Sequence, residues 1–173
     1  PWVSYARMVT LRTPKQLTSI DLGVPSLTFR AWIEAQAGPE AWEKLDKIPR
    51  GDWMAYLRWY RRVLNLPVVN ETKLTLIEPL GGGLHRLHVE GAGAPAKTLL
   101  ARKVVLATGI QGGGGWHVPE MIRDALPERL YAHSSEPIDF AALRGKRIGI
   151  LGGGASAFDN AQHALGEGAA EAH

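Results

Sequence analysis

Hydrophobic residues recur every three to four positions in the first third of the chain, which is the spacing of one face of an amphipathic helix. Phe29, Trp32 and Ile33 lie on one such stripe. Ser26 is the expected N-cap of this helix, and Gly38 is its expected end. The pattern therefore predicts a helix that packs an aromatic face into a core.

A second helical stripe follows a short segment over residues 40–48, with Asp52 as its expected N-cap. Its opposite face is basic. We interpret it as a core-packing helix with a solvated basic face, and binding of an anion or substrate by one of the arginines is the alternative. The apolar stripe consists of Trp53, Tyr56, Leu57, Tyr60, Val63 and Leu64, and the basic face of Arg58, Arg61 and Arg62.

The middle of the chain changes to a period of two, which indicates β-strands. We expect strands at residues 68–69, 74–76 and 84–89, with a glycine hairpin turn at 81–83. The segment over 99–108 ends in a nearly all-apolar stretch, which suits a strand that is buried on both faces of an α/β sheet. These segments predict a β meander followed by a buried strand.

The last part of the chain places a strand, a glycine turn and a helix in direct succession, with the strand expected over 147–151 and the helix over 155–165. The turn matches the dinucleotide fingerprint G-x-G-x-x-A at Gly152, Gly154 and Ala157. The first glycine allows the tight turn, the second lets a pyrophosphate approach the backbone, and the alanine lets the helix pack closely on the strand.

Free amides and a partial positive charge at the start of this helix favour phosphate, and Ser156 adds a hydroxyl donor. The spacing predicts a nucleotide site, and a glycine-rich turn without a ligand is the alternative. The ribose-reading residue is expected about 20 positions past the glycines, at the end of a following strand that we expect to lie beyond the chain. The choice between NADH and NADPH therefore stays open.

Composition excludes several classes of protein. The 173 residues carry 20 Lys and Arg against 17 Asp and Glu, a balance that does not argue for nucleic acid as a partner. The absence of cysteine excludes a disulfide framework and a redox dithiol. No apolar run is long enough for a membrane span, and no signal peptide is evident, so we expect a cytoplasmic protein without a membrane partner. His85 and His88 would point to opposite faces of a strand, so no metal site is expected.

Three segments resemble the flavin-dependent, NAD(P)H-using monooxygenases, the group of flavin-containing, Baeyer–Villiger and N-hydroxylating enzymes. They are VVLATG at residues 104–109, YAHSSE at 131–136 and LRGKRIGILGGGASAFDNA at 143–161. The resemblance covers residues 52–165. It implies an α/β fold of the two-dinucleotide-binding-domain flavoproteins, with Rossmann-like FAD- and NAD(P)-binding domains, of which this chain is a part with a helical insert and a β meander.

The resemblance also implies a domain organisation. Residues 1–112 would belong to the FAD-binding domain, with a helical substrate-side region at 1–66 and the meander and ATG strand at 67–109. Residues 113–145 would form the linker between domains, and 146–173 the start of the NAD(P)-binding domain. The family's first glycine fingerprint, which holds the FAD pyrophosphate, is absent, so we expect an internal fragment of a larger enzyme.

Cofactor contacts follow from the resemblance as well. The ATG element would pass close to FAD, and the strand around residue 74 would present backbone groups to the FAD adenine. The His133–Ser134 pair matches the family's HS pair, with no catalytic role carried over, and catalytic residues stay unassigned. The implied cofactor-binding residues are Leu74, Ala107, Thr108 and Gly109 for FAD, and Gly152, Gly153, Gly154, Ser156 and Ala157 for the nicotinamide cofactor.

The implied function is an FAD- and NAD(P)H-dependent oxidoreductase, specifically a monooxygenase that inserts one oxygen atom from dioxygen into a small organic substrate. In this family NAD(P)H reduces the flavin, and the reduced flavin activates dioxygen. Three alternatives remain: a flavin-dependent NAD(P)H reductase without oxygen insertion, a non-catalytic dinucleotide sensor, and a fragment that is only a stable folding unit. The substrate and the oligomeric state stay open, a homo-oligomer included.

Overall fold

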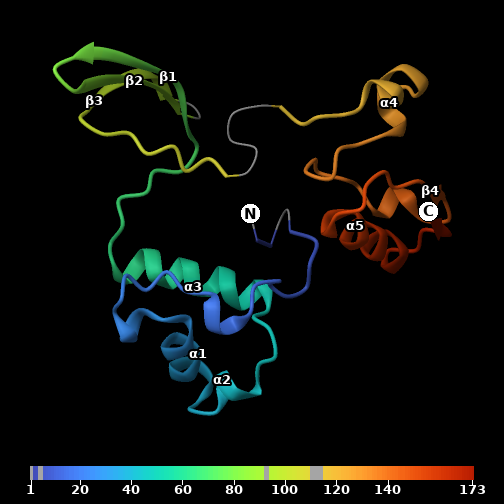
Figure 1. The fold of residues 1–173 in the computed structure, drawn as a ribbon, viewed down its shortest axis with the longest axis horizontal. Helices are drawn as coiled ribbons and strands as arrows, with labels where there is room; N and C mark the ends of the chain where they lie inside the picture. Colours follow the sequence, from blue (N-terminus) through green and yellow to red (C-terminus); the bar gives the residue numbers. More distant parts are fainter. Residues whose placement is uncertain (1, 4–5, 92–93, 110–114) are drawn as a thin grey trace. The chain divides into compact units, whose positions relative to one another are not determined.

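The structure, a computed structural model, describes residues 2–3, 6–91, 94–109 and 115–173. It divides into two compact units, with unit 1 formed by Pro1–Asn65 and His117–His173 and unit 2 by Leu66–Trp116 (Figure 1). Short 3-10 turns occur at η1 (Lys15–Leu17), η2 (Pro25–Leu27), η3 (Glu128–Leu130) and η4 (Ala141–Leu143). The longer elements are α1 (Phe29–Ala37), α2 (Ala41–Lys44), α3 (Arg50–Val63), β1 (Thr72–Gly81), β2 (Leu84–Gly91), β3 (Ala94–Ala101), α4 (Glu120–Ala125), β4 (Arg147–Ile148), α5 (Ala155–Gly166) and β5 (Glu171–Ala172).

Aromatic side chains build the core around α1, α2 and α3, which we call the helical core. Phe29 lies at its centre, with its ring centroid 5.4 Å from that of Tyr56 and 6.0 Å from that of Trp53. Offset and edge-to-face pairs at these separations stabilise a core beyond the area they bury. The first predicted stripe is therefore confirmed as core, and the second is confirmed except at its end, where Val63 is 52% exposed. Its buried members are Leu11, Phe29, Trp32, Ile33, Trp42, Ile48, Trp53, Tyr56 and Tyr60.

Both expected N-caps of these helices were wrong. The cap of α1 is Thr28, whose hydroxyl accepts a 3.1 Å hydrogen bond from the amide of Ala31, while Ser26 lies inside η2. Helix α3 begins directly after Pro49, and Asp52 lies within its first turn rather than before it. A carboxylate in the first turn interacts favourably with the helix dipole without capping it.

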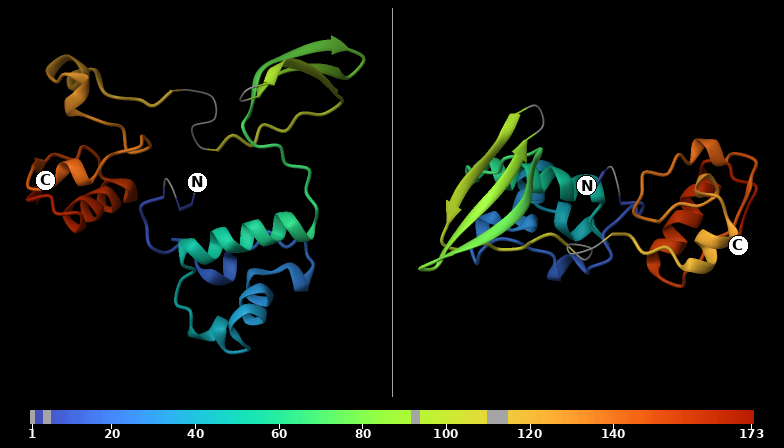
Figure 2. Two further views of the ribbon diagram at one scale, coloured as in Figure 1. Left: turned by 180° about the vertical axis from the view of Figure 1, so that it is seen from behind. Right: turned by 90° about the horizontal axis from the view of Figure 1, so that it is seen from above.

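Unit 2 contains a three-stranded antiparallel meander in the order β1-β2-β3, which confirms the predicted meander (Figure 2). Gly81, Gly82 and Gly83 all have positive φ angles; Gly81 ends β1, and Gly82 and Gly83 form the predicted turn to β2. The strand expected at residues 68–69 is wrong, because both valines are exposed and lie outside any ladder.

The strand expected over residues 99–108 is only partly right. β3 ends at Ala101, and residues 103–109 follow without a strand assignment. Val105 is 86% exposed and Leu106 is 69% exposed. A strand forms only where a neighbour satisfies its N–H and C=O groups, and the part of the chain that the structure describes supplies no such neighbour here.

The end of unit 1 forms a βαβ unit, in which α5 connects two parallel strands. β4 pairs with β5, and Ile150 N donates to His173 O at 2.7 Å while His173 N donates to Ile148 O at 3.0 Å. The strand after the glycine helix therefore begins within the chain, which corrects the expectation that it lies beyond. We call β4, α5 and β5 the βαβ module.

The C-terminal end of α5 shows why the predicted helix stops where it does. Gly168 has a φ of +99°, its amide donates to Leu165 O at 3.0 Å, and Ala169 N donates to Ala164 O at 2.9 Å. This is a Schellman motif with glycine in the left-handed position. Ala164, Ala169 and Phe140 are buried together and form the small core of the βαβ module.

Candidate nucleotide-binding site

The glycine turn lies between the carboxyl end of β4 and the amino end of α5 (Figure 1). In parallel α/β sheets this is the edge at which ligands bind. Gly152 has a φ of +145°, a conformation that L side chains rarely adopt. The backbone conformation therefore favours glycine here, and a Cβ at this position would lie 3.9 Å from the Cβ of Ala157, in ordinary van der Waals contact.

Gly154 is the N-cap of α5, and it leaves open space beside the backbone. An added Cβ would meet no protein atom within 4 Å. No side chain caps the N-terminal amides of α5, and its first turn carries no acidic residue. The first N–H groups and the positive end of the helix dipole are thus left for an anion. These residues fit the pyrophosphate of a dinucleotide.

The first turns of α5 also place two polar side chains. Ser156 is exposed, and its carbonyl accepts a 2.7 Å hydrogen bond from Asn160 Nδ2. Asn160 itself is buried at 9% exposure, and its Oδ1 is buried without a partner among the described residues. The structure therefore brings the five expected nicotinamide-site residues onto one turn, with Asn160 one helical turn behind Ser156.

Sequence reasoning missed a long-range ion pair on this helix. Arg12 Nη2 lies 2.5 Å from Asp159 Oδ1, and the Asp159 side chain is only 16% exposed. The two residues are 147 positions apart. No local pattern could have found this pair, because residue 12 lies in a segment without hydrophobic periodicity.

The residues expected near FAD lie in unit 2 and do not form a site by themselves. Leu74 is in β1 opposite Val89, next to a shift in register. Ala107, Thr108 and Gly109 lie after β3, and all of these positions are exposed. Two surface hollows on the meander are lined by other residues. The assignment of these residues to the flavin stays a prediction.

The HS pair lies in a closed turn. Ser135 N donates to His133 Nδ1 at 3.1 Å, His133 N donates to Glu136 Oε1 at 3.1 Å, and Glu136 N donates to His133 O at 2.8 Å. Because Nδ1 accepts a hydrogen bond, the neutral ring carries its proton on Nε2. These contacts give His133 a structural role in shaping the turn.

Within the described residues, no three His, Asp or Glu side chains come together as a metal-binding group. None of the helices in the same part of the chain is long and apolar enough to cross a membrane.

Comparison with known proteins places the chain in a class of flavin-dependent monooxygenases. A sequence model of the L-lysine 6-monooxygenase/L-ornithine 5-monooxygenase family matches residues 41–172, so the chain belongs to this family. The chain is 68% identical over 173 residues to the FAD-dependent urate hydroxylase of Xanthomonas campestris pv. campestris. That alignment covers 99% of this chain and 36% of the relative, so the chain spans about a third of that protein's length. No solved structure matches the chain. The resemblance stated from the ATG, HS and glycine segments is confirmed.

Proposed function

We propose that the chain is part of an FAD- and NAD(P)H-dependent monooxygenase and that residues 152–157 bind the pyrophosphate of the nicotinamide cofactor. The observation that carries this proposal is the glycine turn between a parallel strand and an uncapped helix. When bound there, the nicotinamide dinucleotide supplies a hydride. The chain's own residues bind and orient it: Gly152 shapes the turn, Gly154 admits the pyrophosphate, and Ser156 offers a hydroxyl donor.

The larger organisation is part of the same proposal. We assign residues 1–112 to the FAD-binding side, with Leu74 and the 107–109 segment near the flavin, 113–145 to the linker and 146–173 to the NAD(P)-binding side. Two dinucleotide-binding domains of Rossmann-like fold would complete the enzyme. Membership in a flavin monooxygenase family and the name of the urate hydroxylase support this assignment.

The ribose-reading residue is not Glu171, although it falls about 20 residues past the first glycine. The strand register pairs Glu171 with Arg147, at the end of the strands opposite the glycine turn. Its carboxylate is also bound to Arg147 Nε at 3.0 Å and to His173 Nε2 at 2.9 Å. We infer that the preference for NADH or NADPH is decided elsewhere.

Urate is the substrate that we propose, together with dioxygen. The similarity to a urate hydroxylase extends over almost the whole chain at 68% identity, which favours urate over the amine substrates in the family's name. Hydroxylation of the side-chain amine of L-lysine or L-ornithine is the second candidate, and the match to that family favours it. Oxygen consumption by the flavin-loaded complete enzyme with NADPH or NADH, with each substrate in turn, separates the two. NAD(P)H oxidation that no substrate accelerates would instead support the reductase.

The nucleotide site is tested with Gly154→Val in the complete enzyme. The backbone at Gly154 tolerates a side chain (φ −88°, ψ 168°), and no protein atom lies in its way, so the fold is expected to survive. The new side chain would instead occupy the place of the pyrophosphate. Calorimetric titration with NADP⁺ and NAD⁺ should show loss of binding.

Gly166→Val is the matched control, because Gly166 lies at the other end of α5 and an added Cβ there also meets no atom within 4 Å. It should leave the dissociation constant unchanged. Wild-type affinity in Gly154→Val would show that the turn is structural only.

A further inference from the structure

Asp159 is the single acidic side chain of α5, and it lies close behind the glycine turn. With a rise of about 1.5 Å per residue, it is roughly 7 to 8 Å along the helix axis from Gly154. A carboxylate at that separation repels a pyrophosphate, and the repulsion is felt because it lies within about one Debye length. The helix that would bind the cofactor therefore carries an unfavourable charge.

Arg12 lies directly on this carboxylate, with Nη2 2.5 Å from Asp159 Oδ1. The guanidinium side chain is 56% exposed, while the Asp159 side chain is 16% exposed. We propose that Arg12 neutralises Asp159 and thereby preserves the affinity of the glycine turn for a dinucleotide anion. This inference rests on the proposed nucleotide site, and it assigns Arg12 a positioning role through electrostatics rather than direct contact.

The backbone next to Arg12 is fixed to the helical core. Leu11 N donates to Ile48 O at 2.8 Å, and Arg50 N donates to Val9 O at 3.0 Å. Leu11 is 5% exposed and belongs to the helical core. Residue 12 follows this anchored segment directly, which limits the positions that its side chain can reach.

A second arginine of the same segment contacts the region next to α5. Arg7 Nη2 donates to Glu136 O at 3.2 Å, and its guanidinium carbon lies 5.1 Å from the centroid of the Phe140 ring. Phe140 in turn packs edge-on against His163 of α5, with centroids 4.5 Å apart. Arg7 thus contacts the segment before β4, whereas Arg12 contacts α5 itself at its acidic side chain.

Charge compensation and a merely structural ion pair predict different patterns of affinity. If Arg12 acts by neutralising Asp159, Arg12→Gln should weaken NADP⁺ binding about three- to tenfold, which is about 0.7 to 1.4 kcal/mol. Asp159→Asn should bind at least as tightly as the wild type, because it removes the repelling charge. The Arg12→Gln, Asp159→Asn double variant should return to within about twofold of the wild type.

The experiment is calorimetric titration of the flavin-loaded complete enzyme with NADP⁺ and with NAD⁺. Arg12→Lys should retain most of the affinity because it keeps the charge. The loss of NADP⁺ affinity in Arg12→Gln should be smaller at high ionic strength, because salt screens the uncompensated carboxylate of Asp159. Arg58→Gln, which removes an exposed arginine of α3, is the control for loss of a cation elsewhere. Thermal melting of each variant establishes that it is folded.

Two results overturn the inference. One is an Asp159→Asn variant that binds NADP⁺ as weakly as Arg12→Gln does. Equal losses would mean that the ion pair matters as a structural bond and not through its charge. The other is an Arg12→Gln variant with wild-type affinity. The Gly154→Val titration separates these from failure of the proposed function: if Gly154→Val still binds normally, the nucleotide site itself is wrong. If Gly154→Val loses NADP⁺ binding but the Arg12 and Asp159 variants do not show the expected affinities, only the charge compensation is wrong.

Discussion

The hydroxyl of Tyr56 donates a 2.6 Å hydrogen bond to the main-chain carbonyl of Leu27, at the centre of the helical core. Tyr56 is fully buried, and its ring contacts those of Phe29 and Trp53. Burial, with smaller contributions from Tyr60 and Asp21, raises the pKa of the Tyr56 phenol to about 12. The folded core therefore holds this side chain in its neutral form.

A raised pKa makes the stability of the helical core sensitive to alkaline pH. The contribution of neutral Tyr56 is fully present below the ordinary phenol pKa of about 10 and is lost as the pH rises through about 12. Tyr56→Phe should flatten this loss. It should also cost about 1 to 2 kcal/mol at neutral pH, because the Leu27 carbonyl loses its donor. Urea unfolding followed by tryptophan fluorescence, from neutral pH to pH 12, measures both the loss of stability at neutral pH and its dependence on alkaline pH.

Tyr131→Phe is the control, since Tyr131 is only partly buried and lies outside the helical core. The free energy of unfolding of Tyr131→Phe should fall with rising alkaline pH as it does in the wild type. A Tyr56→Phe protein whose stability falls between pH 10 and 12 as steeply as the wild type would assign the effect to another group.

Lys15 is a buried lysine that holds the end of α2. Its Nζ donates to Trp42 O at 2.7 Å and to Leu45 O at 2.6 Å, and it lies 4.8 Å from the Trp42 ring centroid. Lys15→Met keeps the length of the side chain but removes its hydrogen bonds to both carbonyls, of which Trp42 O still accepts from Leu45 N at 3.3 Å. The free energy of unfolding should fall by about 2 to 4 kcal/mol.

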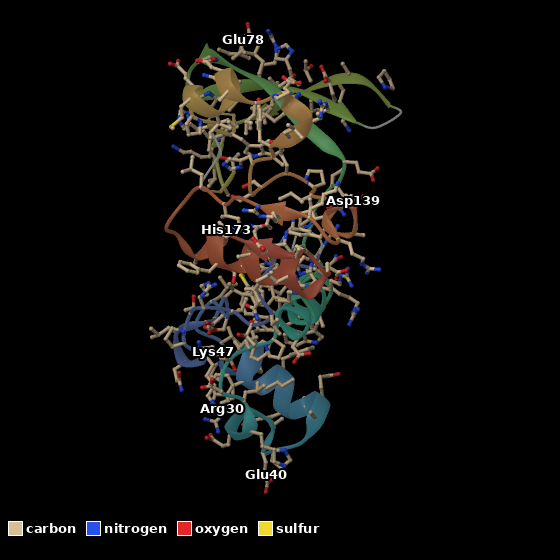
Figure 3. The ribbon with its side chains drawn as sticks, turned by 90° about the vertical axis from the view of Figure 1, so that its right-hand side faces the viewer. Arg30, Glu40, Lys47, Glu78, Asp139 and His173 are labelled. Atoms are coloured by element: carbon tan, nitrogen blue, oxygen red, sulfur yellow. The ribbon has the colours of Figure 1, made fainter. Side chains whose placement is uncertain are left out.

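Tryptophan fluorescence suits this measurement because five of the six tryptophans lie in or against the helical core. The matched control is Lys47→Met, at an exposed lysine of the same region that Figure 3 labels. Its expected effect is below about 0.5 kcal/mol. Equal losses in the two variants would contradict the role of Lys15.

The ion cluster on the meander allows a prediction of a pKa rather than of stability. Glu78, labelled in Figure 3, lies on β1, and its Oε2 is 3.4 Å from Nε2 of His88 and 2.9 Å from Nη1 of Arg86 on the neighbouring strand β2. The hydrogen bond from His88, followed by that from Arg86, lowers the pKa of the Glu78 carboxyl below its ordinary value. His88→Ala and Arg86→Ala should each raise it.

Carbon-detected NMR titration of the Glu78 carboxyl measures these values directly. Because the folded pKa is the lower one, any stability from the cluster is present above the ordinary glutamate pKa and is lost as the pH falls through the folded value. His85→Ala is the control, since residue 85 faces the other side of the strand. An unshifted Glu78 pKa in both His88→Ala and Arg86→Ala would show that the cluster does not act on this carboxyl.

The elements that the sequence predicts well are those whose evidence is local. The stripe through Trp53, Tyr56 and Tyr60 identifies α3 because its periodicity repeats over several turns. The glycine turn and the end of α5 follow from the conformational freedom of glycine. Ser26 and Thr28 are both good caps, and only the extra turn of η2 decides between them.

The features that sequence reasoning missed depend on partners far along the chain. Arg12 and Asp159 are 147 positions apart, and Lys15 is 27 positions from Trp42. Residues 103–109 carry the composition of a buried strand, yet composition does not supply a neighbouring strand, and Val105 is exposed. Pairing between distant segments, rather than local pattern, decides each of these cases.

The assignment of the 107–109 segment to the flavin side leads to the last prediction. Thr108 lies in exposed backbone before Gly109, whose φ is +81°, so a larger side chain can be accommodated without disturbing a core. If this backbone passes close to FAD, Thr108→Trp should weaken flavin binding by about tenfold or more, or ~1.4 kcal/mol, and leave NADP⁺ affinity unchanged. Visible flavin absorbance per mole of purified enzyme, followed by titration of the apoprotein with FAD, provides the measurement. Thr98→Trp is the control, because Thr98 is also exposed but lies on β3 opposite His88. Full flavin occupancy in Thr108→Trp would remove residues 107–109 from the flavin site, and equal losses in both variants would point to damage to unit 2 instead.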